Sequence, residues 1–277
     1  MKKFLKQFLK EIIPTFVLKY IRYINNSKRL KGNFISWDEA LKQSTGYDAE
    51  IILKKVLSAT LKVKSNDNLY ERDSVLFNKN QNSFPLLAAL LYVAAKNKNK
   101  LNVLDYGGSL GSSYFQCKKL LADMELQWNI VEQPNFVKTG IKYIQDDKLK
   151  FHYSINDCLR TNKPNVILLS GVLQCLEKPY DLILDICDKN IDYIIIDRTP
   201  FSKKEFITIQ VVAPEIYPAS YPLWIFNQNK LLDLFQNKYL LIFEFDPIDG
   251  AIKRFKNSIY FKGFFLKNKK INHSLLL

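Results

Sequence analysis

The sequence predicts an α/β fold in which helices cover a mostly parallel sheet of seven strands, preceded by a helical N-terminal extension. From residue 101 onward, short apolar runs alternate with segments of helical periodicity, which is the pattern of strand–helix–strand units with parallel strands. The last two apolar runs, 239–245 and 257–268, follow each other without a helix between them, so we expect an antiparallel pair at the end of the sheet. A glycine-rich turn, Gly107 to Gly111, comes directly after the first run.

The N-terminal extension is predicted to consist mainly of helices. Ser36 is the expected N-cap of the first one, and Glu39 three residues later completes a capping box. Segments 49–63 and 84–96 have the composition and period of helices, whereas 66–77 between them is polar, aromatic and irregular.

Residues 1–31 form a basic amphipathic segment. Apolar residues recur there at helical spacing with lysines opposite, interrupted at Pro14. Two interpretations stay open, a helix lying on an anionic membrane surface and a terminal helix packed on protein. The net charge of +14 is carried by the two ends, with nine Lys and Arg against one Glu in 1–31 and seven against none in 250–277. Since the body is close to neutral, we do not expect a nucleic-acid enzyme.

The remaining elements are expected in regular order along the chain. The predicted strands are 101–105, 128–132, 149–154, 165–170, 191–197, 239–245 and 257–268. The predicted helices are 110–122, 135–144, 179–188 and 228–236. Residues 200–226 are predicted to be a loop, which is long enough to suggest an active-site lid. The chain is therefore divided into the basic segment 1–31, a helical cap region 32–98 and a domain 99–277 that carries the sheet.

Composition places the chain in the cytoplasm. Apolar residues at 47% and charged residues at 25% are ordinary for a globular protein. The four cysteines lie far apart without a C-x-x-C pair, which argues against a zinc site or a disulfide framework, and we expect no metal. No pattern of a secretory signal or a membrane span occurs. The two histidines, His152 and His273, do not suggest a Ser/His/Asp triad.

The glycine turn is expected to bind a small polar ligand at the carboxyl ends of the strands. No lysine follows Gly111, which excludes the phosphate-binding G-x-x-x-x-G-K-[ST] loop. A dinucleotide turn, G-x-G-x-x-G, would need glycine where Tyr106 stands. The remaining pattern, acid-x-G-x-G-x-G, is matched by Asp105, Gly107 and Gly111, with Ser109 in the middle glycine's place.

Two carboxylates favour S-adenosylmethionine (SAM) as that ligand. Asp105 ends the first strand and suits a cofactor with a sulfonium and an ammonium, whereas a pyrophosphate would avoid a nearby anion. Glu132 ends the second strand, 21 residues after Gly111, where a carboxylate can accept both ribose hydroxyls. The ribose marker alone would also fit NAD. A turn whose glycines serve only packing is the alternative.

The chain resembles a family of SAM-dependent methyltransferases found among the genes of bacterial surface-polysaccharide (O-antigen and capsule) biosynthesis. The resemblance lies in VLDYGGSLGSSYFQ, WNIVEQPNFV, ILLSGVLQCLEKPYDLI, YIIIDRTPF and YPASYPLWIF, and it extends to SWDEALKQSTGYDAEIILKKVLSATLKV, YERDSVLF and FPLLAALLYVAA. It implies a Rossmann-like seven-stranded methyltransferase fold with SAM as cofactor and S-adenosylhomocysteine as product. Ser109 belongs to the family's own GGSLG form.

The expected cofactor-binding residues lie at the carboxyl ends of the first four strands. They are Asp105, Gly107, Gly108, Ser109, Gly111, Glu132, Gln133, Ser154, Ser170, Gly171 and Val172.

The acceptor site is expected after the fourth and fifth strands, because methyl transfer needs an aligned acceptor and exclusion of water. The expected catalytic residues are Gln174, Arg198 and Tyr221, and the expected substrate-binding residues are Arg72, Asp197 and Tyr217. The Asp–Arg pair could orient a sugar phosphate, and tyrosines of the lid could stack on sugar rings. The alternatives are a solvent-facing helix cap for the glutamine, an internal salt bridge for the Asp–Arg pair, and a hydrophobic cover for the tyrosines.

These observations predict a SAM-dependent methyltransferase that O-methylates a sugar of a surface polysaccharide or its precursor. An NAD(P)-dependent oxidoreductase and a non-catalytic interaction module of the same fold are the competing functions. The expected partner is a glycan precursor and no nucleic acid, while a peripheral membrane contact through the basic N-terminus and an oligomer stay open.

Overall fold

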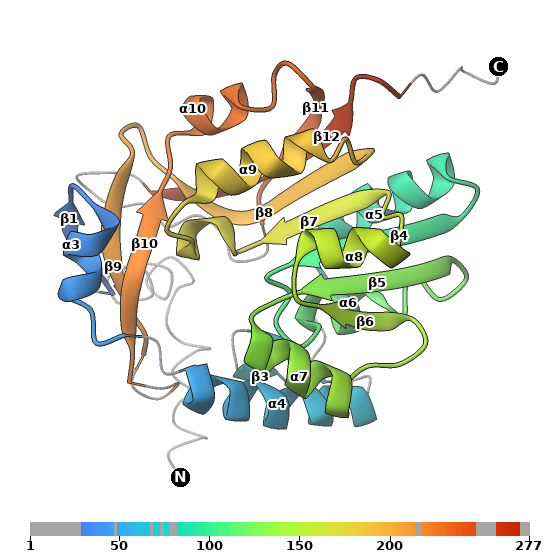
Figure 1. The fold of residues 1–277 in the computed structure, drawn as a ribbon, viewed down its shortest axis with the longest axis horizontal. Coiled ribbons are helices and arrows are strands. Elements are labelled where there is room, and N and C mark those ends of the chain that lie inside the picture. The colour runs from blue at the N-terminus through green and yellow to red at the C-terminus, as the bar shows by residue number, and fades with distance from the viewer. Residues whose placement is uncertain are drawn as a thin grey trace, which may run out of the picture.

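The structure is a computed structural model that describes residues 29–46, 49–66, 69–72, 75–77, 82–213, 216, 218–247 and 259–271 (Figure 1). The predictions for the basic N-terminal segment lie almost entirely outside these residues, as do Tyr217 and His273. The division of the chain at residues 31 and 98 stays a prediction.

The large sheet has the predicted architecture. Its strand order is β11 (Tyr239–Phe245), β12 (Tyr260–Asn268), β8 (Tyr193–Phe201), β7 (Val166–Ser170), β4 (Lys100–Tyr106), β5 (Glu125–Val131) and β6 (Leu149–His152). The five strands from β8 to β6 are parallel, and β12 pairs antiparallel with both β8 and β11. This confirms the seven-stranded, mostly parallel sheet with its antiparallel last strand.

Helices cover both faces of this sheet because its central strands are apolar on both sides. On β4, Val103 belongs to one hydrophobic core and Leu104 to the other, as successive side chains of a strand must. The first core also takes residues from α4 (Ala49–Ser65), α5 (Phe84–Lys96), α6 (Ser112–Cys117) and α7 (Pro134–Tyr143). The second takes residues from α8 (Ile155–Thr161), α9 (Pro179–Asp188) and α10 (Gln228–Asp233), and α9 crosses the front of the sheet in Figure 1.

The prediction of a loop over residues 200–226 is wrong, because this segment folds mostly into strands. β8 continues to Phe201, and β9 (Phe206–Val211) and β10 (Ser220–Ile225) then pair antiparallel. β1 (Leu30–Phe34) adds to β9, which gives a separate three-stranded sheet in the order β1-β9-β10. Pro222 suggested a loop, but β10 is an edge strand, where a residue without an N–H is tolerated.

The N-terminal extension is less helical than predicted. The helices α3 (Trp37–Lys42), α4 and α5 confirm the expected ones, and the Ser36 hydroxyl accepts a hydrogen bond from the Glu39 amide at 3.2 Å. The stretch 66–77 contains a hairpin of β2 (Tyr70–Arg72) and β3 (Val75–Phe77), in which the facing rings of Tyr70 and Phe77 stack at 5.7 Å. The sequence interpretation missed this hairpin, β1 and α8.

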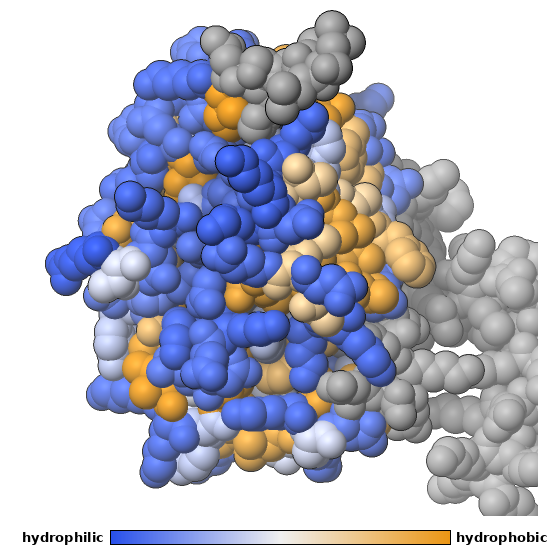
Figure 2. All heavy atoms as spheres, turned by 90° about the vertical axis from the view of Figure 1, so that its right-hand side faces the viewer, coloured by the Kyte–Doolittle hydropathy of each residue, from blue (hydrophilic) through white to orange (hydrophobic). Residues whose placement is uncertain are grey.

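The edge where the parallel strands begin is largely polar. Figure 2 shows that most of the described residues on this side are hydrophilic. Lys100 at the start of β4 and Glu125 at the start of β5 form an exposed ion pair there, 3.1 Å from Nζ to Oε2. Within the described residues, no helix is both long and apolar enough to cross a membrane. The functional groups gather at the opposite edge.

Candidate functional site

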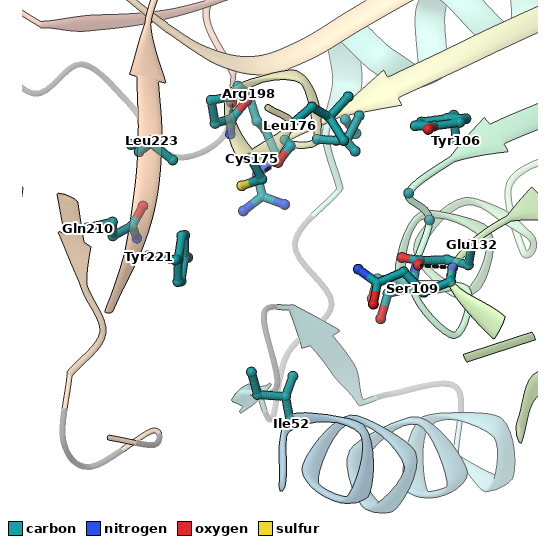
Figure 3. Close-up of a pocket in the computed structure, with 18 of the residues that line it drawn as sticks. Ile52, Tyr106, Ser109, Glu132, Cys175, Leu176, Arg198, Gln210, Tyr221 and Leu223 are labelled. Carbon is teal, nitrogen blue, oxygen red and sulfur yellow. Dashed lines mark hydrogen bonds between the residues drawn. The ribbon is translucent and has the colours of Figure 1, made fainter. Parts of the chain in front are cut away.

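A cavity of about 1520 Å³ lies at the carboxyl ends of the parallel strands. Its walls come from the ends of β4, β5, β7 and β8, from the small sheet β1-β9-β10, and from α3 and α4 (Figure 3). β4 pairs with β5 on one side and with β7 on the other. The strands that follow β4 in the chain therefore lie on opposite sides of it, and the strand order reverses at this point. This is the switch point at which doubly wound sheets bind ligands.

Most of the predicted site residues line this cavity. They are Arg72, Asp105, Gly107, Gly108, Ser109, Glu132, Gln133, Ser154, Ser170, Gly171, Val172, Gln174, Arg198 and Tyr221. Gly111 and Asp197 do not line it, and Tyr217 lies outside the described residues.

The glycine turn connects β4 to α6 with close packing on its underside. Gly107 has φ +72°, and a Cβ there would lie 2.3 Å from Val172 Cγ2. A Cβ on Gly108 would lie 2.5 Å from the carboxyl carbon of Asp105. Packing alone therefore requires glycine at both positions, as the alternative interpretation held. The upper side of Gly107, Gly108 and Ser109 is partly exposed toward the cavity, so the same glycines leave the backbone open to a ligand.

Two residues predicted to bind the cofactor do not face the open part of the cavity. Asp105 lies beneath the glycine turn, and Gly111 lies at the start of α6. Asp105 is 1% exposed, and one of its carboxyl oxygens accepts a hydrogen bond from Trp128 Nε1 at 3.0 Å. Burial raises the pKa of Asp105 to about 7, the Trp128 bond opposes this, and the charge of Glu132 adds to it. Asp105 thus supports the turn, and its predicted contact with SAM would be made from beneath Gly108. Gly111 instead caps α6 at φ +102°, facing Leu149 and Phe115.

Glu132 stands directly after β5 and beside the glycine turn. One carboxylate oxygen accepts from the Ser109 amide at 3.2 Å and the other from the Gln133 amide at 2.7 Å. Burial raises the pKa of Glu132, and these two backbone hydrogen bonds act in the opposite direction. Figure 3 shows Glu132 and Ser109 together on one side of the cavity. Ser109 adopts φ +55°, a left-handed conformation that a glycine would adopt more easily.

The ends of β7 and β8 form the next wall. Gln174 is 8% exposed, and its Nε2 donates to the Arg198 carbonyl at 3.2 Å, while its Oε1 has no hydrogen-bond partner among the described residues. Arg198 adopts φ +54°, and its guanidinium lies over Gly171, 3.6 Å from where a Cβ would be. In Figure 3 the Arg198 side chain points into the cavity beside Cys175. The carbonyl oxygen of Gln174 is therefore a buried acceptor whose hydrogen-bonding capacity is not used among the described residues.

Asp197 is the predicted substrate-binding residue that the structure places differently. It is 2% exposed, and its carboxylate accepts from the Ser170 hydroxyl at 3.3 Å and from the Arg198 amide at 2.9 Å. These bonds hold the strand ends together behind the cavity wall. A substrate contact by Asp197 is therefore not what the structure shows, and its position agrees with the alternative of an internal structural role.

Ser154 and His152 lie near the site at the end of β6. The Ser154 hydroxyl caps α8 by accepting from the Asp157 amide at 3.0 Å, although the residue also lines the cavity. His152 Nε2 lies 3.1 Å from the Asn129 side-chain oxygen, and burial lowers its pKa. His152 is not among the lining residues, which agrees with the structural role expected of it.

The small sheet forms the wall across from the glycine turn, and the β2–β3 hairpin borders the cavity beside the start of α6. Tyr221 of β10 faces Gln210, its cross-strand partner on β9, and both side chains border the cavity in Figure 3. Glu71 of β2 lines the cavity at 3% exposure, next to the predicted Arg72. Sequence reasoning missed Gln210, for which no local signal exists. Glu71 stands in the stretch Tyr70–Arg72, from which the sequence predicts a wall of the site opposite residues 200–226.

Comparison with known proteins finds similar folds but no sequence relative. No protein-family profile matches the chain, and no curated protein sequence matches it. The N-terminal domain of EvdMO1, solved in the presence of S-adenosylhomocysteine and D-fucose, is 10% identical with a TM-score of 0.47, over 80% of this chain and 98% of that one.

Two further solved structures match a smaller share of this chain. A SAM-dependent methyltransferase from Clostridium acetobutylicum is 10% identical with a TM-score of 0.42, over 68% of this chain and 92% of that one. SAM-bound CalS10, an amino pentose methyltransferase from Micromonospora echinaspora, is 8% identical with a TM-score of 0.41, over 67% of this chain and 90% of that one. At these TM-scores, the assignment of the fold rests on the strand order of the large sheet.

Proposed function

We propose that this protein is a SAM-dependent methyltransferase. The observation that carries the proposal is the carboxylate of Glu132, which directly follows β5 and lies beside the partly exposed turn Gly107–Ser109 at the switch point of the sheet. A carboxylate in this place can accept both ribose hydroxyls of the cofactor. Tyr106, at the position where a dinucleotide turn has its first glycine, favours SAM over NAD.

The acceptor is proposed to be a sugar of a bacterial surface polysaccharide or its precursor. The cavity, at about 1520 Å³, exceeds the about 300–1,000 Å³ of an ordinary ligand pocket, so a second molecule has room beside the cofactor. Away from the glycine turn it offers an aromatic face from Tyr221 and amides from Gln210 and Gln174, a combination that suits a hydroxylated ring. The sequence resemblance supports a surface glycan as the source of that ring.

The residues at the strand ends are proposed to align this acceptor. SAM would supply a methyl group on a sulfonium, which becomes a neutral thioether when an acceptor oxygen takes the methyl and releases its proton. Gln174 Oε1 can accept a hydrogen bond from the acceptor hydroxyl and so fix its direction. Arg198, held over Gly171, can bind an anionic group such as a sugar phosphate.

Binding and transfer should be tested separately. Isothermal titration should show that S-adenosylhomocysteine binds and that NADH does not, and absence of S-adenosylhomocysteine binding would refute the proposal. Labelled methyl from SAM should then appear in nucleotide-linked, lipid-linked or polymeric sugars of a glycan extract. Binding of the cofactor without transfer to any fraction would favour the non-catalytic module instead.

A further inference from the structure

Glu71 places a buried carboxylate beside the glycine turn. It belongs to the β2–β3 hairpin, outside the large sheet, yet it is 3% exposed and lines the cavity. Its Oε2 accepts a hydrogen bond from the hydroxyl of Ser112, the first residue of α6. Because α6 begins directly after Gly111, this bond ties the hairpin to the end of the turn. A buried carboxylate is costly as an anion unless a cation pairs with it, so a cationic group that enters the cavity would stabilise the charged form of Glu71.

The other acids of the cavity already have different environments. Asp105 faces Trp128 and is covered by Gly108. Glu132 accepts from two backbone amides at the end of β5, the position suited to a ribose. Asp185 is exposed on α9 and forms an ion pair with Lys189 at 2.9 Å. Of the four acids that line the cavity, Glu71 is therefore the buried one at the α6 end of the turn.

We infer that Glu71 binds the α-ammonium group of the methionine part of SAM. This inference rests on the proposed function and deepens it. The ammonium is a strong hydrogen-bond donor with a full positive charge, and a charge-assisted bond in a partly buried site is stronger than a neutral one. The Ser112 hydroxyl holds the carboxylate in place, so the hairpin contributes a cofactor-binding residue from outside the sheet.

The test is the substitution Glu71→Gln, which keeps the shape and an oxygen that can accept from Ser112 but removes the charge. Two probes are titrated into each protein: S-adenosylhomocysteine, and its analogue in which hydrogen replaces the α-amino group. We expect the variant to bind S-adenosylhomocysteine about tenfold or more weakly, and the deaminated analogue as tightly as the unaltered protein does. Glu125→Gln is the matched control, because Glu125 lies exposed at the opposite edge of the sheet.

The other possible results of these titrations each contradict the inference. Equal loss of affinity for both probes would assign Glu71 a structural role in holding α6, and unchanged affinity for both would remove it from cofactor binding. Either result would overturn the inference and leave the proposed function intact. If the unaltered protein does not bind S-adenosylhomocysteine, the proposed function and the inference fail together. Thermal unfolding of each variant, together with binding of the deaminated analogue, shows that the site is folded.

Discussion

Replacing Asp105 by asparagine tests the energetic effect of the carboxyl buried under the glycine turn. Burial raises the pKa of Asp105 from 3.8 to about 7, so the folded protein keeps a proton that the unfolded chain loses across this range. Stability conferred by the protonated group is therefore lost as the pH rises from about 4 to 7, and the loss is complete above 7. Three pKa units correspond to about 4 kcal/mol in total.

The variant Asp105→Asn should lack this pH-dependent loss. Asparagine keeps an oxygen that can accept from Trp128 Nε1 but does not ionise. Between pH 5 and pH 7 the unaltered protein loses stability because its unfolded chain is ionised at Asp105 while its folded form is still mostly protonated. Over these two pH units the free energy of unfolding of the variant should therefore rise by about 3 kcal/mol relative to that of the unaltered protein. Above pH 7 the difference should stay constant.

Urea denaturation at pH 5, 6, 7 and 8 measures this difference directly. The titration of Glu132 and His152 contributes to both proteins and largely cancels in the comparison. A difference between the two proteins that is the same at all four pH values would refute the reasoning, because it would mean that Asp105 titrates alike in the folded and unfolded chains.

Three further substitutions test the same site. Trp128→Phe removes the donor to Asp105, so the protein should lose about 2 kcal/mol of stability, and the pKa of the carboxyl, followed by the pH dependence of unfolding, should rise further. A pH profile that matches that of the unaltered protein would contradict this. Gln174→Leu removes both the Oε1 acceptor, which has no partner among the described residues, and the Nε2 donor to the Arg198 carbonyl, so the protein should lose about 1 to 2 kcal/mol of stability, while methyl transfer falls about tenfold or more. Retained transfer would exclude Gln174 from acceptor alignment. Glu132→Gln should weaken S-adenosylhomocysteine in titration by about tenfold, and unchanged affinity would rule out the ribose contact.

Much of the site could be predicted because strand ends are visible in the sequence. Asp105 and Glu132 each follow an apolar run, and parallel strands bring their carboxyl ends to one edge. What could not be predicted is the direction of each side chain at that edge. Asp105 turns toward Trp128, 23 residues away in the chain, and its burial depends on the packing of Gly108 above it.

The small sheet is the second feature that could not be predicted from the sequence. Its outer strands β1 and β10 contain glycine and proline, so their local signals resemble those of a loop, whereas β9, FITIQV, has the composition of a strand and was included in the predicted loop. They become strands because β9 pairs on both sides, and the Thr208 hydroxyl reaches the Lys31 carbonyl across 177 residues of sequence. The pairing of β1 with β9 cannot be seen in either local sequence, because the two strands are more than 170 residues apart.

The sequence by itself determined the succession of strands and helices of the large sheet along the chain, its mostly parallel character, the glycine turn and the carboxylate of Glu132, because these depend on local periodicity and on the geometry of strand–helix–strand units. Only the tertiary structure decided that β1, β9 and β10 form the far wall, that Asp105 is buried beneath the glycine turn while Asp197 lies behind the cavity wall, and that Glu71 borders the glycine turn. Each of these depends on which distant segments pack together, since burial and hydrogen bonding are properties of the assembled chain.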